Sequence, residues 1–182
     1  MTAQTKYYPI ATSPTIGVNL NSTYAGTTTD GENAPYALGT TVLGSDGGQY
    51  TLVQAGAAIS TTTSQPFCIA MDGAWQANKI TKALASAAKT IGFAPQLVIS
   101  DNDFFWARMR GSHCNIKVAV SCAADVNLWT TATAGVLDDT SGGSHVVVLG
   151  VRLATAASAS VSAESTVRAA VITYPLNPGL IA

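Results

Sequence analysis

Charged residues are scarce in this sequence. They make up 10% of its 182 residues, against about 25% in an average soluble domain. The nine basic and ten acidic side chains give a net charge of −1, and no run of Lys or Arg occurs. The lack of a basic block excludes the electrostatic footprint of a nucleic-acid-binding protein and of a basic helix on a membrane surface. Small neutral residues replace charge, so we expect the surface to be covered by a partner.

Long apolar runs are also missing. No stretch approaches the roughly 18 apolar residues of a transmembrane helix, and residues 1–20 lack the apolar core of a signal peptide. The three cysteines, Cys68, Cys114 and Cys122, do not have the spacing of metal ligands. We therefore expect buried thiols in a protein made in the cytosol of its host. A disulfide would form only if two of the three face each other.

Signatures of catalysis are absent as well. The sequence has no nucleophile elbow, no phosphate-binding loop and no dinucleotide fingerprint. His113 and Cys114 are adjacent, so on a strand their side chains would point to opposite faces. A catalytic pair would have to combine His145 with one of the cysteines, and nothing in the sequence brings them together. We predict no enzyme activity, no cofactor and no metal site.

Two aspartate pairs are the remaining candidates for chemistry. Asp101 and Asp103 would share one face of an extended chain, as ligands of a calcium loop do, but the glycine and the distal glutamate of an EF-hand loop are missing. Asp138 and Asp139 precede a Ser-Gly-Gly stretch. Because Asp bonds its own backbone two residues further on, we interpret both pairs as parts of turns.

Alternation of apolar and polar residues is what the sequence has in abundance. This pattern predicts β-strands at residues 15–20, 38–44, 49–55, 66–72, 103–111, 115–121, 145–153 and 166–174. The stretch Ser45-Asp46-Gly47-Gly48 between two of them is typical of a hairpin turn. A short helix is predicted within residues 77–90, and no internal repeat is visible. These features indicate an all-β fold, a sandwich or barrel-like domain of short antiparallel strands with at most one short helix.

Residues 1–36 have a different character from the rest of the chain. They contain three prolines and many Thr and Asn, with no helical periodicity. We therefore divide the chain into an extended N-terminal arm, residues 1–36, and a β domain, residues 37–182. The arm has too many apolar side chains for a solvated tail, and we expect it to contact another subunit or partner. Its candidate contact residues are Tyr7, Tyr8, Ile10, Ile16 and Tyr24.

Several motifs in order resemble a known family. Residues 36–59, YALGTTVLGSDGGQYTLVQAGAAI, resemble the opening of small head proteins of tailed bacteriophages, which are encoded near the major capsid protein. Residues 91–111 (IGFAPQLVISDNDFFWARMRG) and 122–139 (CAADVNLWTTATAGVLDD) are similar to the return strand and the small-residue loop of that family. The segments VVVLGVRLATAAS and VRAAVITYPL are similar to its closing strands.

This resemblance implies a decoration, or cement, protein with no catalytic residues. Such a protein binds the outer capsid surface and stabilises the head. Its partner would be the major capsid protein, and we expect a dimer or trimer located on the virion. An alternative hypothesis is a carbohydrate-binding or head-fibre β domain, because the aromatic faces of Trp75, Trp106 and Trp129 could stack on sugar rings.

Overall fold

The computed structural model describes residues 11–13, 17–26, 36–60, 65–87, 90–143, 145–157 and 166–176. Strands account for 43% of the structure and helix for 4%, which confirms the predicted all-β, barrel-like fold with one short helix. In chain order the elements are β1 (Ala11–Ser13), β2 (Thr23–Tyr24), β3 (Thr41–Gly44), β4 (Gln49–Ala55), β5 (Cys68–Met71), β6 (Gln76–Lys79), α1 (Lys82–Ser86), β7 (Thr90–Phe93), β8 (Phe104–Val118), β9 (Leu128–Thr130), β10 (Leu137–Asp138), β11 (Val147–Leu153) and β12 (Thr166–Leu176).

Five strands close into a ring in the N-terminal half of the molecule. β4 pairs with β6 in parallel, whereas β6 with β5, β5 with β7, β7 with β8, and β8 with β4 pair antiparallel. We call this barrel the N-terminal ring. Beyond β4 its sheet is extended by β3 and then β1, both antiparallel to their neighbours.

A second ring of five strands follows and has the same strand order. β8 pairs with β10 in parallel, whereas β10 with β9, β9 with β11, β11 with β12, and β12 with β8 pair antiparallel. In both rings the first strand in chain order pairs with the third in parallel, and the fifth strand returns to pair with the first. This C-terminal ring therefore repeats the topology of the N-terminal ring, although no repeat is visible in the sequence.

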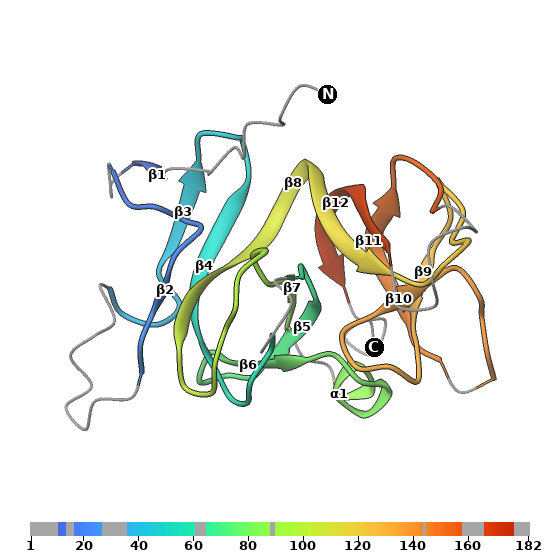
Figure 1. The fold of residues 1–182 in the computed structure, drawn as a ribbon, viewed down its shortest axis with the longest axis horizontal. Coiled ribbons are helices and arrows are strands. Elements are labelled where there is room, and N and C mark those ends of the chain that lie inside the picture. Colours follow the sequence, from blue (N-terminus) through green and yellow to red (C-terminus); the bar gives the residue numbers. More distant parts are fainter. Residues whose placement is uncertain are drawn as a thin grey trace.

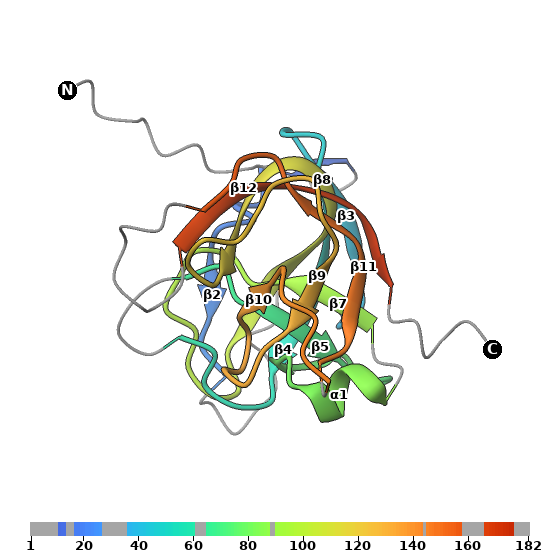
Figure 2. The same ribbon diagram turned by 90° about the vertical axis from the view of Figure 1, so that its right-hand side faces the viewer.

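One long strand joins the two rings. β8 has 15 residues and is both the last strand of the N-terminal ring and the first strand of the C-terminal ring. Its residues 104–110 pair with β4, and its residues 111–118 pair with β12. Figure 1 shows β8 passing from one half of the molecule to the other. In Figure 2 the molecule is turned so that the C-terminal ring faces the viewer. The two strands predicted at residues 103–111 and 115–121 are thus one continuous strand.

Side chains of β8 enter all three hydrophobic cores. In its first half, Phe105 and Ala107 pack with residues of β4, β5 and β6, while Trp106 belongs to a second core with β3 and β4. In its second half, Ile116 and Val118 join residues of β9, β10 and β11. All five side chains are completely buried, and each large one stabilises the fold by about 1.5–3 kcal/mol. The alternation that the sequence predicts along this strand is confirmed.

The third core also fastens the two rings together. Cys68 and Phe93, from the outer face of the N-terminal ring, pack in the same cluster as Leu137 of the C-terminal ring. Main-chain hydrogen bonds reinforce this junction: Gly135 N donates to Ile80 O, and Cys68 N donates to Gly135 O, both at 2.9 Å. The rings therefore share packing and backbone pairing as well as β8.

The described part of residues 1–36 packs on the rest of the same chain. Tyr24 in β2 pairs with Phe104 in β8, and Leu20 is completely buried in the core beneath β3 and β4. Residues 17–20 form turns around a single β-bridge residue, Asn19, rather than the strand predicted there, although Leu20 lies in the core and Val18 packs against it, as the alternation predicts. Residues 17–26 are therefore built into the β structure.

The short helix predicted within residues 77–90 is confirmed, and strand pairing sets where it begins. Residues 76–79 form β6, which pairs with β4 and β5, so the helix is restricted to Lys82–Ser86. Thr81 is its N-cap, with an extended backbone and a side-chain oxygen that accepts a hydrogen bond from Leu84 N at 3.3 Å. Tertiary pairing has overridden helix propensity here. Among the described residues, no helix has the length and apolar character needed to cross a bilayer.

Gly111, where β8 passes from one ring to the other, provides the first prediction. Its φ is +138°, and a Cβ at this position would lie against the Arg108 guanidinium and 3.0 Å from Gly48 Cα. Gly111→Ala should therefore lower the free energy of unfolding by about 1–3 kcal/mol. Gly143→Ala is the control because a Cβ there meets nothing within 4 Å. Urea denaturation of both variants measures the effect; equal unfolding midpoints would contradict the strain at Gly111.

Candidate functional site

The turn between β3 and β4 is tied to β8 by a charged hydrogen-bond network. Asp46 Oδ2 accepts hydrogen bonds from Arg108 Nη1 and from Tyr50 Oη, both at 2.7 Å, and Asp46 Oδ1 accepts one from Gly48 N at 2.9 Å. The Arg108 guanidinium carbon also lies 5.4 Å from the centre of the Tyr50 ring, a cation–π distance. Only 13% of the Arg108 side chain is exposed. The network fixes the hairpin on β8.

Burial and charge set the protonation states around Arg108. Burial alone would raise the pKa of Asp46, but the hydrogen bonds from Tyr50 and Gly48 and the charge of Arg108 outweigh it, so the pKa lies below its usual value. Burial raises the pKa of Tyr50 despite the opposing effect of Arg108, and raises the pKa of Cys114 to about 11. The phenol and the thiol are thus protonated at neutral pH, when neither is a nucleophile.

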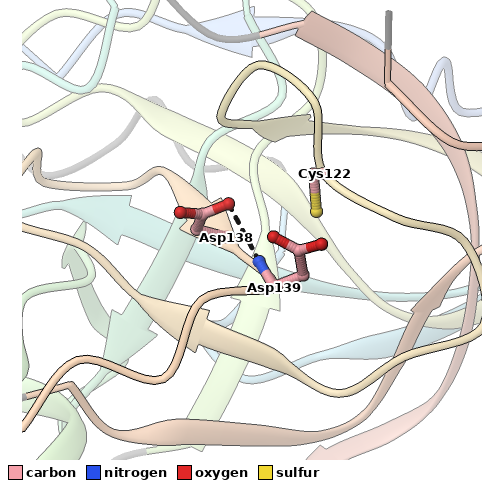
Figure 3. A group of neighbouring side chains, drawn as sticks. All are labelled: Cys122, Asp138 and Asp139. Atoms are coloured by element: carbon pink, nitrogen blue, oxygen red, sulfur yellow. Dashed lines mark hydrogen bonds between the residues drawn. The ribbon is translucent and has the colours of Figure 1, made fainter. Parts of the chain in front are cut away.

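A thiol and two carboxylates meet at the end of β10 (Figure 3). The ligand atoms of Cys122, Asp138 and Asp139 lie within 4.8 Å of one another, close enough to approach one metal ion. Both carboxylates already bind the backbone, however: Asp138 Oδ1 accepts from Asp139 N at 2.9 Å, and Asp139 Oδ2 accepts from Ala123 N at 2.8 Å. Asp139 thus holds the segment around residue 123 rather than closing the local turn that the sequence predicts.

The charges in this cluster disfavour ionisation. Burial raises the pKa of Cys122 to about 12, and the carboxylates of Asp139 and Asp138 contribute. Burial and the neighbouring Asp139 carboxylate also raise the pKa of Asp138. The Cys122 thiol is therefore protonated at neutral pH. The arrangement serves the fold, with carboxylates capping backbone N–H groups.

The other predicted chemical groups are also occupied by the fold. Asp103 is buried, and its two carboxylate oxygens accept hydrogen bonds from Ser100 N at 2.8 Å and Gly26 N at 3.4 Å. Asp101 is exposed beside it. All three cysteines are free and buried, as predicted from their number and spacing. The side chain of His113 lies outside the described residues.

A buried lysine, Lys117, lies at the junction of the two rings, and the sequence does not predict its burial. Lys117 alternates with the buried residues Ile116 and Val118 along β8, yet only 7% of it is exposed. Its ammonium nitrogen lies 4.8 Å from the centre of the Phe67 ring, and that of Lys79 lies 5.0 Å from the same ring. Lys117 N donates to Pro66 O at 3.0 Å. The N-terminal ring thus covers what would otherwise be a solvent-facing side of the C-terminal ring.

An open groove of about 370 Å³ lies next to this junction. It is lined by Thr81, Lys82, Ala83, Thr131, Ala132 and His145. Residues from the start of α1 thus face residues of the β9–β10 hairpin. Sequence reasoning missed this site, since Lys82 and His145 are 63 positions apart and neither belongs to a motif.

The tryptophans do not form one aromatic platform. Trp106 is completely buried in the core beneath β3, with its ring centre 5.9 Å from that of Tyr36. Trp75 packs against the core inside the N-terminal ring, whereas Trp129 lies in β9 of the C-terminal ring. Trp106 is therefore not available to stack on a sugar.

The candidate contact residues are mostly beyond what the structure describes. Tyr7, Tyr8, Ile10 and Ile16 lie outside the described residues. Tyr24 is half-buried and packs against the core beneath β3. Comparison with known proteins adds nothing further, since the chain matches no protein-family model and no curated protein.

The network around Asp46 predicts a stability loss that depends on pH. Asp46→Asn keeps an acceptor for Gly48 N but removes the charge that binds Arg108 and Tyr50, and should lower the free energy of unfolding by about 1–2 kcal/mol at neutral pH. Because the folded-state pKa of Asp46 is lowered, its contribution is present above the unfolded value and is lost as pH falls through the folded pKa. Thermal melts should show the difference shrinking in acid; a difference independent of pH would contradict this account.

The contribution of Asp138 to stability should depend on pH in the opposite direction from that of Asp46. Its raised folded-state pKa means that the native protein binds the proton more tightly than the unfolded chain, so stability falls as pH rises through the folded pKa. Asp138→Asn retains an oxygen to accept from Asp139 N and should slightly raise the melting temperature at about pH 7. In acid, the variant and the wild-type protein should have the same melting temperature. A variant less stable at neutral pH would show that the charge of Asp138 is favourable.

Proposed function

We propose that this protein is a structural component of a tailed-bacteriophage head that binds the outer face of the capsid shell and stabilises it. The partner is the major capsid protein, and the protein acts on the virion as a dimer or trimer. It is made in the cytoplasm of the bacterial host. The resemblance of residues 36–176 to phage head proteins supports this assignment.

The observation that carries the proposal is how the fold uses its reactive side chains. The three thiols are buried, and the carboxylates of Asp46, Asp103 and Asp139 accept backbone N–H groups. These groups stabilise turns and strand ends. A protein whose chemistry is committed in this way acts through the shape and composition of its surface, as a cement protein does.

The continuous sheet also suits a structural role in a capsid. Both rings are closed by strand pairing and share β8 as well as a hydrophobic core. A body of this kind can bridge neighbouring capsid subunits without deforming. Because the shell presents many equivalent sites, weak contacts made by several subunits of an oligomer combine into tight attachment.

The test is co-sedimentation of the purified protein with heads of its own phage assembled without it. Saturable binding, followed by greater resistance of the decorated heads to heat or low pH, is the expected result. Heads that fail to bind the protein at any concentration, or that gain no stability from bound protein, would count against the assignment.

The role of the arm can be tested in the same assay. Removing residues 2–10 deletes Tyr7, Tyr8 and Ile10 and leaves Leu20 and β2 in place, so the core beneath β3 is preserved. We expect this deletion to weaken head binding by about tenfold or more, the effect of losing about 1.4 kcal/mol of contact energy. A variant with the same nine residues in scrambled order is the matched control for length and composition. Unchanged binding of the deletion variant would remove the arm from the interface.

A further inference from the structure

The groove beside the ring junction is built from both halves of the molecule. One wall is Thr81, Lys82 and Ala83, which follow β6, and the other is Thr131 and Ala132, which follow β9. His145, just before β11, completes the lining. A volume of about 370 Å³ is at the lower end of the range for small-molecule sites.

Main-chain hydrogen bonds hold both walls in position. Gly135 N in the β9–β10 hairpin donates to Ile80 O at 2.9 Å, which fixes the hairpin against the residue before Thr81. On the other side, Thr130 N donates to Val146 O at 2.9 Å, and Val146 N donates to Thr130 Oγ1 at 3.0 Å. The backbones next to Thr131 and His145 are thus locked together. A ligand would meet a groove that is already formed, which lowers the entropic cost of binding.

The lining contains a lysine, no acidic residue and several hydrogen-bond donors. None of the six lining residues is acidic, and two of them, Lys82 and His145, can carry positive charge. Gly142 N donates a hydrogen bond to His145 Nδ1 at 3.3 Å, and in that tautomer the ring hydrogen is on Nε2; Nδ1 also lies 3.2 Å from Thr140 O. Its other ring nitrogen, Nε2, makes no hydrogen bond among the described residues and is left for a ligand. Thr81 Oγ1 accepts from Leu84 N, so its hydrogen is available to donate.

We propose that this groove binds a small molecule through a carboxylate or phosphate group. The Lys82 ammonium supplies the ion pair, while His145 Nε2 and the Thr81 hydroxyl donate hydrogen bonds to the anion oxygens. The methyl groups of Ala83 and Ala132 contact the apolar part of the ligand. The site does not depend on capsid binding, since it follows from the groove alone.

The test is a titration of the isotope-labelled protein followed by NMR. Sodium phosphate and sodium malonate are added separately at constant ionic strength, with sodium chloride as the reference for non-specific ion effects. We expect saturable shifts of the backbone amide signals of Lys82, Ala83 and Thr131 and of the His145 ring signals, with a Kd of about 1 mM. Saturation with phosphate alone or malonate alone identifies the anion, and saturation with neither overturns the proposal.

Matched variants separate specific binding from the effect of net charge. Lys82→Gln and His145→Gln should each weaken binding by about tenfold, whereas Arg152→Gln removes an exposed positive charge of the C-terminal ring outside the groove and should leave the Kd unchanged. Because Lys82 is exposed, its replacement should leave the spectrum dispersed as in the wild-type protein. Equal Kd values for Lys82→Gln and Arg152→Gln would show that the anion is attracted by net charge alone.

Discussion

The register of β8 is the constraint on which both rings depend. In its first half Phe105 and Ala107 face the core inside the N-terminal ring, and in its second half Ile116 and Val118 face the core of the C-terminal ring. A slip of one residue along any partner strand would move a whole set of apolar side chains to the wrong face. Because one strand serves two rings, a slip in one ring would be passed to the other. The bond of Arg108 to the Asp46 turn secures the register close to Gly111, where the strand changes ring.

The repeated strand order explains why the chain shows no repeat in its sequence. Ring topology is defined by which strands pair, and it tolerates wide variation in what connects them. The third and fourth strands of the N-terminal ring are joined through α1, whereas the corresponding connection of the C-terminal ring is the loop that contains His145. The two rings also differ in their neighbours: β3 and β1 extend the sheet of the first ring beyond β4, and Phe67 packs on Lys117 of the second. Each ring surface therefore meets different surroundings, so the same pairing order is compatible with different residues.

The sequence predicts those features that depend on local pattern. Alternation along residues 103–111 and 115–121 predicts the buried faces of β8, and the Asp-Gly turn predicts the β3–β4 hairpin. Both succeed because strand periodicity and turn preference depend on residues that are neighbours in the sequence. The short helix predicted within residues 77–90 is confirmed at Lys82–Ser86, but its start depends on β6, because residues 76–79 pair with two strands. The burial of Lys117 and the groove could not be predicted from local pattern, because both depend on contacts between the rings: Lys82 and His145 line one groove where the β9–β10 hairpin bonds Ile80.

Many of the few carboxylates in this chain bind backbone N–H groups of the protein itself. Asp46, Asp72, Asp103, Asp138 and Asp139 all accept hydrogen bonds from backbone N–H groups. With only 10% charged residues in the chain, the use of these acids to bind backbone N–H groups leaves few carboxylates free for contacts with a partner. A surface with few charged groups has little electrostatic steering, so partners must be recognised by shape, apolar contact and neutral hydrogen bonds. These contacts are weak individually, and they become strong when many copies bind a repeating lattice. The proposed anion groove, with Lys82 and no acidic side chain in its lining, would be an exception on such a background.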